Sequence, residues 1–191
     1  MTSHFYAMLS RMKNIYRWGL MRNTRQENLS EHSLEVALIA HALAVIRNRR
    51  FGGNLNAEHI ACAAMFHDTS EIITGDMPTP IKYFNDDIKD AFKQIEALAD
   101  DKLIALLPED LRDDFCNLYN PTDEEKKIIK AADKLSALIK CIEENAMGNR
   151  EFADAERATR KALEKMDLPE IKAFLEEFIP SFSLTLDEQK N

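Results

Sequence analysis

The chain has 191 residues and a net charge of −8, and 45% of its residues are hydrophobic. This length suits one domain over residues 1–191 that buries about 70% of its unfolded surface without disulfide support. The acidic balance argues against binding of long nucleic acids, so we expect any anionic ligand to meet local cations. No segment reads as a signal peptide or a membrane span, and the three cysteines form no CxxC pair. We therefore expect a cytoplasmic protein with reduced thiols and no membrane contact.

Helical periodicity dominates the whole chain. Five glycines and six prolines interrupt it, and the apolar residues recur every 3.6 positions without β-strand alternation. This pattern predicts an all-α fold, a single compact multi-helix bundle whose last eight or so residues fray. In chain order, the expected helices cover residues 4–16, 30–49, a stretch from the N-cap Asn56 to about His67, 86–107, 109–118, 122–147, 149–166 and 168–178. The sequence TGDMPTP at 74–80 predicts a loop.

The helix at 30–49 is expected to be central to the bundle. Its middle, LEVALIAHALAVI, is apolar on nearly every face, which is typical of a buried helix. His41 lies inside this run, and we expect it to be a hydrogen-bonded core histidine. His32 lies in the first turn of the same helix, next to a polar segment.

Four potential metal ligands occur in three separate places: His32, the adjacent pair His67 and Asp68, and Asp133. Two imidazoles and two carboxylates suit a divalent first-row metal with positions left open for water or a phosphate oxygen. Adjacent side chains on a regular helix point about 100° apart, so His67 and Asp68 can share an ion only at a helix end. The apolar run ACAAMF stops there, and Asp133 borders a buried stripe where an unpaired carboxylate is costly.

Further polar residues are candidates for chemistry. If the helical turn continues past His67, Glu71 shares its face, with Cβ atoms roughly 5–6 Å apart, and a carboxylate there reaches an activated water. Asp76, after a turn glycine, is the alternative general base, and the residues alone do not choose between the two. Arg17 suits bidentate phosphate binding, and Trp18 suits packing against a base or sugar.

Four segments carry a resemblance to a known family: RW at 17–18, RNTRQENLSEHSLEVA at 22–37, HDTSEIITGDMPTPIKYFN at 67–85 and ADKLSALIKC at 132–141. On these residues the chain resembles the HD-domain superfamily of metal-dependent phosphohydrolases, and within it the bacterial 5′-deoxynucleotidases. The resemblance implies hydrolysis of deoxyribonucleoside 5′-monophosphates to deoxynucleoside and phosphate by attack of a metal-activated water.

The resemblance also implies roles for individual residues. The metal ligands would be His32, His67, Asp68 and Asp133, and the catalytic residues Glu71 and Asp76. The substrate-binding residues would be Arg17, Trp18, His32, Asp76 and Thr79. It further implies a homodimer and one divalent transition metal ion, with cobalt or manganese expected to support activity in vitro.

Two alternatives remain at this point. The chain could be an HD-type phosphohydrolase for another small phosphoester or nucleotide, or a non-catalytic helical module in which the metal is structural. Removal of Glu71 separates a structural site, which is indifferent to this carboxylate, from a catalytic one.

Overall fold

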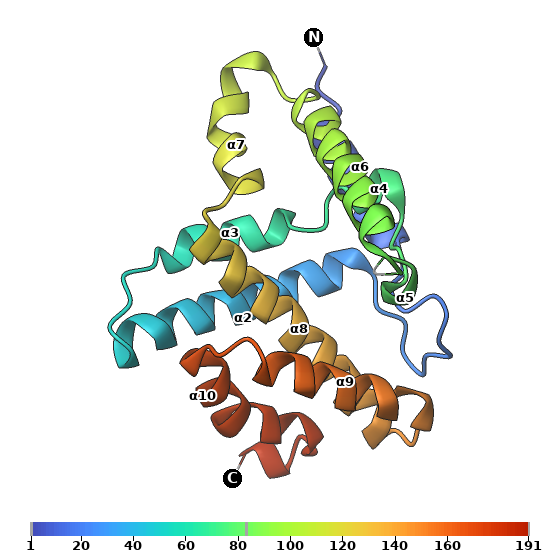
Figure 1. Ribbon diagram of the computed structural model, residues 1–191, viewed down its shortest axis with the longest axis vertical. Coiled ribbons are helices and arrows are strands. Elements are labelled where there is room, and N and C mark those ends of the chain that lie inside the picture. Colours follow the sequence, from blue (N-terminus) through green and yellow to red (C-terminus); the bar gives the residue numbers. More distant parts are fainter. Residues whose placement is uncertain (1, 83, 191) are drawn as a thin grey trace.

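The computed structural model describes residues 2–82 and 84–190, in which the regular elements are helices (Figure 1). The α-helices are α1 Phe5–Leu9, α2 Leu29–Arg50, α3 Ala57–Phe66, α4 Glu71–Thr74, α5 Thr79–Lys82, α6 Asp86–Ile104, α7 Arg112–Tyr119, α8 Asp123–Ala146, α9 Ala153–Glu164 and α10 Pro169–Glu177. Short 3₁₀ helices are η1 Ser10–Asn14, η2 Glu109–Leu111, η3 Arg150–Phe152, η4 Ile179–Ser183 and η5 Glu188–Lys190. Within the described residues, β-pairing is limited to one isolated antiparallel bridge. The predicted all-α fold is confirmed.

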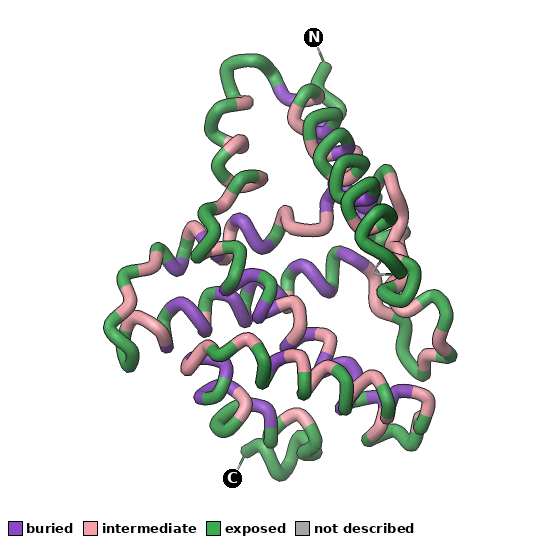
Figure 2. The backbone as a smooth tube through the Cα atoms, in the orientation of Figure 1, coloured by how far each residue is buried: buried purple, intermediate pink, exposed green. Residues whose placement is uncertain are grey.

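Helix α2 is the centre of the bundle. It begins with a capping box, in which the Asn28 side chain accepts hydrogen bonds from the backbone N–H groups of Ser30 and Glu31. It then packs against α3, α8 and α10, and Figure 2 shows buried positions concentrated along α2 and α8. Val36 and Leu43 of α2 meet Ile60 of α3 and Leu135 of α8 in one apolar cluster. The capping box therefore fixes where the first turn of the central helix, and His32 with it, enters the core.

One face of α2 departs from the sequence prediction. Leu34 and Leu38 are 56% and 65% exposed, and His41 and Val45 continue the same open face. The prediction that His41 is a core residue is wrong, because a helix that is apolar all round does not reveal which face stays uncovered.

The sequence showed no segment with the pattern of a membrane span, but α2 has the length and hydropathy of one. Of that apolar window, 56% is buried in the fold. Its packing against three helices is that of a core helix.

The N-terminal and loop predictions are corrected in two places. The helix expected at 4–16 is α1 followed by the 3₁₀ helix η1, and the chain becomes extended at Ile15. There Leu29 N–H donates to Ile15 C=O at 3.0 Å, and Arg17 N–H donates to Glu27 C=O at 3.0 Å, so pairing with the segment before α2 ends the helix. The loop expected at 74–80 overlaps the start of α5. The tail that was expected to fray contains the 3₁₀ turn η5.

The segment between η1 and α2 is held against the C-terminal half of α8 by one buried carboxylate. Glu144 accepts hydrogen bonds from Thr24 N and Oγ1 at 2.9 and 2.7 Å, from Arg25 N at 3.2 Å and from Asn149 Nδ2 at 2.8 Å. Lys140 pairs with the same carboxylate at 2.5 Å. Burial alone raises the pKa of Glu144, but the hydrogen bonds from Lys140 and Thr24 outweigh it and hold that pKa well below its usual range. This clamp positions the loop that carries Arg17 and Trp18.

We predict that Glu144→Gln lowers the free energy of unfolding by about 3 kcal/mol, because it leaves the buried Lys140 ammonium without its counter-ion. A group with a lowered native pKa stabilises above its ordinary pKa of 4.5, and this stabilisation is lost as the pH falls. The difference between wild type and variant in urea denaturation should therefore shrink from pH 6 to pH 3. Glu143→Gln, at the exposed neighbouring position, is the matched control and should stay within about 0.5 kcal/mol of wild type. Equal stability of the two variants at pH 7 would contradict the clamp.

Candidate metal centre

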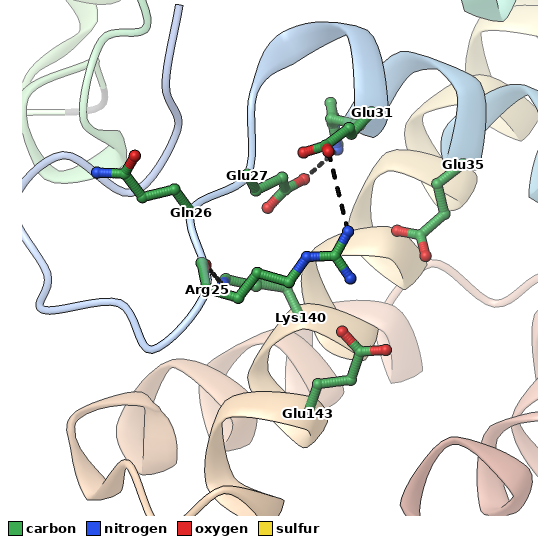
Figure 3. Close-up of a pocket in the computed structure, with 8 residues that line it drawn as sticks. Arg25, Gln26, Glu27, Glu31, Glu35, Lys140 and Glu143 are labelled. Atoms are coloured by element: carbon green, nitrogen blue, oxygen red, sulfur yellow. Dashed lines mark hydrogen bonds and ion pairs between the residues drawn. The ribbon is translucent and has the colours of Figure 1, made fainter. Parts of the chain in front are cut away.

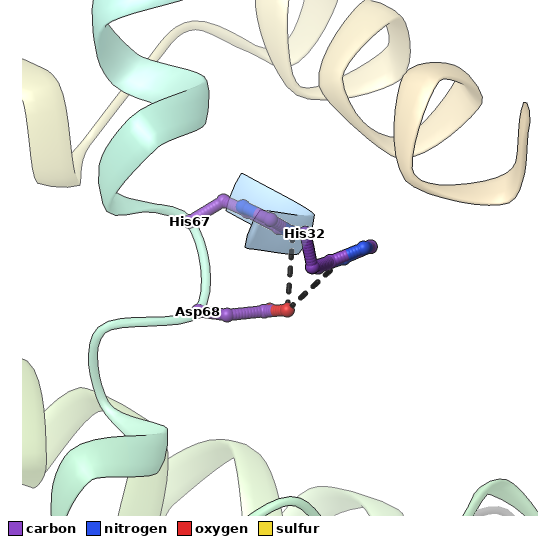
Figure 4. Close-up of side chains that lie close together, drawn as sticks. All are labelled: His32, His67 and Asp68. Atoms are coloured by element: carbon purple, nitrogen blue, oxygen red, sulfur yellow. Dashed lines mark ion pairs between the residues drawn. The ribbon is translucent and has the colours of Figure 1, made fainter. Parts of the chain in front are cut away.

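Two imidazoles and one carboxylate converge between α2 and the end of α3 (Figure 4). His67 Nε2 lies 3.1 Å from Asp68 Oδ2, and His32 Nε2 lies 3.5 Å from the same oxygen. Donors bound at about 2.1 Å to a tetrahedral or octahedral ion lie about 3.0–3.5 Å from one another. The two distances from Asp68 therefore fit ligands of a single transition-metal ion, and the three donor atoms all lie within 4.8 Å of one another.

The local sequence explains how His67 and Asp68 come to share one point. Helix α3 ends at Phe66, His67 is its C-cap, and turns follow over residues 67–70. The sequence placed Glu71 on the same face as His67 on the condition that the helix continues past His67, and this condition is not met. Instead, Glu71 N–H donates to Asp68 C=O at 3.1 Å, and Glu71 starts the separate short helix α4. The change of direction at Phe66 lets adjacent side chains face the same ion, which a regular helix forbids.

Both imidazoles are oriented by partners on their other nitrogen. His67 Nδ1 donates to Ala64 C=O at 2.8 Å, and His32 Nδ1 lies 3.1 Å from both Ser136 Oγ and Glu27 Oε1. The two Nε2 atoms are buried and have no hydrogen-bond partner among the described residues. A partnered Nδ1 directs the Nε2 lone pair toward an ion, as in metal sites with an outer layer of hydrogen bonds. The unpartnered Nε2 atoms thus fit a divalent ion that needs nitrogen ligands.

Asp133 completes the predicted set from the third element, α8. Its Oδ1 lies 3.3 Å from His32 Nε2, although it stands just outside the tight group of three. Arg17 reaches Asp68 Oδ2 at 3.2 Å and Asp133 Oδ1 at 3.8 Å. Burial raises the pKa of both carboxyls, but His67, His32 and Arg17 lower that of Asp68, and His32 and Arg17 lower that of Asp133, so both lie below their usual range. Two ionised oxygens therefore border the two imidazoles.

Glu27 is a residue that sequence analysis did not single out. Its carboxylate accepts from Trp18 Nε1 at 2.9 Å, lies 3.1 Å from His32 Nδ1 and 3.6 Å from Arg17 Nε. No sequence spacing reveals this, because the three partners come from an irregular loop and a helix start. One carboxylate therefore links His32, a predicted metal ligand, to both residues expected at the substrate.

The backbone at Trp18 is strained. Its φ is +60°, a conformation that costs a bulky residue about 1–3 kcal/mol and that is concentrated at functional sites. The Glu27 hydrogen bond, a ring contact with Phe152 at 5.3 Å and a hydrogen bond from Asn23 Nδ2 to Trp18 C=O hold this conformation. The surrounding contacts thus fix the direction of the indole.

The remaining predicted residues differ in how they relate to the cluster. Glu71 is buried, and its Oε2 has no hydrogen-bond partner among the described residues. Burial, Asp68 and Asp76 raise the pKa of Glu71 to about 9, and burial raises the pKa of Asp76 while Arg17 opposes it. Thr79 is exposed at the first residue of α5, and no described hydrogen bond joins it to the cluster. The charged groups of the site thus shift the pKa values of Glu71 and Asp76, whereas no described contact joins Thr79 to the cluster.

His32 also lines an acidic cavity of about 220 Å³, and Figure 3 labels the other residues that line it. Its charged lining is four carboxylates, one imidazole and two cations: Glu27, Glu31, Glu35, Glu143, His32, Arg25 and Lys140. Ser136 Oγ, which contacts His32, donates to Glu35 at 2.5 Å. A phosphate dianion is disfavoured in such a cavity. The cavity borders His32, a predicted metal ligand, but does not suit the phosphate of a substrate.

Solved structures share this fold. An HD-domain phosphohydrolase from Listeria innocua matches with a TM-score of 0.80 at 24% identity, covering 98% of this chain and 92% of that one. The HD phosphohydrolase DatZ of cyanophage S-2L, described as bound to dA and one catalytic Zn²⁺ ion, matches with a TM-score of 0.67 at 20% identity, covering 92% and 96%. The all-α bundle with its histidine–aspartate cluster is therefore an HD-domain fold.

Sequence relatives narrow this class to one family. The family model described as 5′-deoxynucleotidase YfbR-like matches residues 4–182. The 5′-deoxynucleotidase YfbR of Escherichia coli is 55% identical over 189 residues, which cover 97% of this chain and 95% of that protein. The chain belongs to the YfbR-like 5′-deoxynucleotidase family, and the resemblance seen in the sequence is confirmed.

We predict that metal affinity rises with pH. Burial and Arg17 lower the pKa of His32, but Asp133, Glu27 and Asp68 outweigh them and raise it to about 9. An ion that binds Nε2 must displace this proton, so below pH 9 each added pH unit should tighten binding about tenfold. Titration calorimetry of chelator-stripped protein with Mn²⁺ at pH 6.5, 7.2 and 8.0, in buffers of different ionisation enthalpy, should show release of about one proton. Affinity that does not change over this range would contradict the proposed role of His32.

Proposed function

We propose that this chain is a metal-dependent 5′-deoxynucleotidase, a phosphoric monoester hydrolase that converts deoxyribonucleoside 5′-monophosphates to deoxynucleoside and inorganic phosphate. The observation that carries the proposal is the pair of buried, unpartnered Nε2 atoms beside the Asp68 carboxylate, in a chain 55% identical to a 5′-deoxynucleotidase. The activity expected from the sequence agrees with this family.

His32, His67, Asp68 and Asp133 would hold the ion. When bound, a divalent ion at such a site polarises a phosphoryl oxygen and lowers the pKa of water toward neutrality. We propose cobalt or manganese as the ions that support activity in vitro, since mixed imidazole and carboxylate donors suit them. Arg17, which already lies beside Asp68 and Asp133, would hold the phosphate through two parallel N–H donors.

Proton transfer is assigned to Glu71 and Asp76. Glu71 has a buried oxygen without a partner, and burial beside Asp68 and Asp76 raises its pKa to about 9 in the metal-free protein. It is therefore suited to donate a proton to the leaving 5′ oxygen, whereas Asp76, which is less buried, is suited to orient the attacking water. Thr79 remains a proposed contact to the substrate on the basis of the family pattern.

Trp18 is the proposed wall beside the sugar. Its direction is fixed by Glu27 and Phe152, so a ribose 2′-hydroxyl would meet a ring that cannot easily move aside. We predict that Trp18→Ala lowers the preference for dAMP over AMP at least tenfold in kcat/KM.

The same assay, phosphate release with added cobalt or manganese, tests the function itself when dTMP is compared with its 3′-monophosphate isomer. Metal-dependent release from the deoxy 5′ compounds is expected; its absence would exclude the proposed function.

We predict that Glu71→Gln loses at least 100-fold in kcat, since proton transfer by a positioned group contributes about 10²–10⁴-fold, and that it still binds metal. Because the pKa of Glu71 is raised in the folded protein, the native state binds more protons than the unfolded chain between pH 4.5 and about 9. The free energy of unfolding therefore falls as the pH rises through this range, so Glu71 destabilises the protein increasingly. Chelator-stripped Glu71→Gln should therefore melt above wild type at pH 8, with a smaller difference at pH 6. Glu58→Gln, at an exposed position of α3, is the control for both readouts.

Two other assignments are distinguished by the same variants. A structural metal module would bind metal and show no turnover in either wild type or Glu71→Gln. An HD phosphohydrolase of different specificity would release phosphate faster from another phosphoester than from dAMP.

We further propose a cytoplasmic homodimer. The free cysteines Cys62, Cys116 and Cys141 support a reducing compartment, and the exposed apolar face of α2 supports a contact between subunits.

A further inference from the structure

A second cavity, of about 360 Å³, borders the cluster and is lined by residues of α3, α5, α6, α7 and α8. His67 and Asp133, two of the proposed metal ligands, form part of its wall. We call it the lysine cleft, because its wall contains six lysines: Lys82, Lys89, Lys93, Lys126, Lys130 and Lys134. The cleft is therefore continuous with the place where a phosphate would be cleaved.

The charge of the lysine cleft is opposite to that of the rest of the chain. Its six lysines face three carboxylates, those of Glu96, Asp100 and Asp133, which leaves an excess of three positive charges in a protein of net charge −8. The acidic cavity that borders His32 has the reverse balance. Because clefts lined by one sign of charge concentrate the opposite ion, an anion near the metal is drawn to this side.

Three of the lysines have no neutralising partner. Lys82 pairs with Glu96 at 2.7 Å, and Lys89 and Lys93 have carboxylates at 3.8 and 4.0 Å. On α8, Lys126, Lys130 and Lys134 follow one another every four residues, and no ion pair involves them in the part of the chain that the structure describes. Like charges at this spacing destabilise a helix by about 0.2–0.5 kcal/mol per pair. Lys126 and Lys130 are exposed and Lys134 is half-buried, so these three ammonium groups are available to an anion that enters the cleft.

The position of the row along α8 separates it from the proposed nucleoside side. Asp133 lies near the middle of α8; Lys126 and Lys130 lie toward the N-terminal end of the helix, and Lys134 directly follows Asp133. The loop with Trp18 is held instead at the C-terminal half, where Lys140 and Glu144 bind it. A deoxynucleoside beside Trp18 would therefore lie toward the C-terminal half of α8, whereas Lys126 and Lys130 lie toward its N-terminal end.

We propose that the lysine cleft binds inorganic phosphate and is the route by which this product leaves the metal centre. The proposal rests on the 5′-deoxynucleotidase function. Lysine ammonium groups suit this task because each is a compact, hydrated charge that meets phosphate without fixed bidentate geometry. A mobile dianion can then pass from Lys134, next to the ligand Asp133, toward Lys130 and Lys126.

The test is a triple variant, Lys126→Gln with Lys130→Gln and Lys134→Gln. Its control is Lys161→Gln with Lys165→Gln and Lys172→Gln, which makes the same charge change at exposed positions in the C-terminal part of the chain, outside the cleft. In the cobalt-loaded enzyme with dAMP, we expect the inhibition constant of added phosphate to rise at least tenfold in the cleft variant, with KM changed less than threefold and inhibition by deoxyadenosine unchanged. The control should match wild type in all three.

Two outcomes would overturn the proposal. If KM for dAMP rises in parallel with the inhibition constant, the cleft receives the phosphoryl group of the substrate rather than the free product. If phosphate inhibits the cleft variant and wild type equally, the cleft does not bind phosphate.

A separate arm does not depend on turnover. ³¹P nuclear magnetic resonance titration of chelator-stripped protein with inorganic phosphate should show binding to wild type and at least tenfold weaker binding to the cleft variant. Wild type that binds phosphate in this experiment but releases none from dAMP would refute the proposed substrate and leave the cleft intact.

Discussion

The site depends on the need of closely spaced imidazoles and carboxylates, gathered around the buried His32, for a cation. His32, His67, Asp68 and Asp133 come from the start of α2, the end of α3 and the middle of α8, and the charged oxygens among them repel one another unless a positive charge lies between them. Arg17 supplies part of that charge through its contacts with Asp68 and Asp133. A divalent ion would satisfy the two Nε2 atoms, which a guanidinium, having only N–H donors, cannot do.

Helix α8 joins the parts of the site into one unit. Asp133, Ser136, Lys140 and Glu144 recur at helical spacing and therefore share one face. Asp133 meets His32 Nε2, Ser136 meets His32 Nδ1, and Lys140 with Glu144 holds the loop that presents Arg17 and Trp18. One rigid helix thus sets both the ligand geometry and the direction of the residues expected at the substrate. The next face of the same helix carries the unpaired lysines, so the route proposed for phosphate starts at the same scaffold.

The sequence predicted the features that depend on local pattern. The end of an apolar run at Phe66 placed His67 and Asp68 at a helix terminus, where the structure has them, and the apolar stripe around Asp133 placed that carboxylate at the edge of the core. Features set by tertiary packing were missed. Glu27 acts through three partners at irregular spacing, and the positive φ of Trp18 is imposed by contacts with Glu27 and Phe152. His41 was misplaced because packing, rather than hydrophobicity, decides which face of α2 is covered.

The most direct test of the account is a crystal structure of the cobalt-loaded protein with anomalous diffraction measured across the cobalt absorption edge. The account predicts one strong peak at about 2.0–2.2 Å from the Nε2 atoms of His32 and His67 and from oxygens of Asp68 and Asp133. A peak bound through other residues, or a site in which either Nε2 atom is not a ligand, would contradict it.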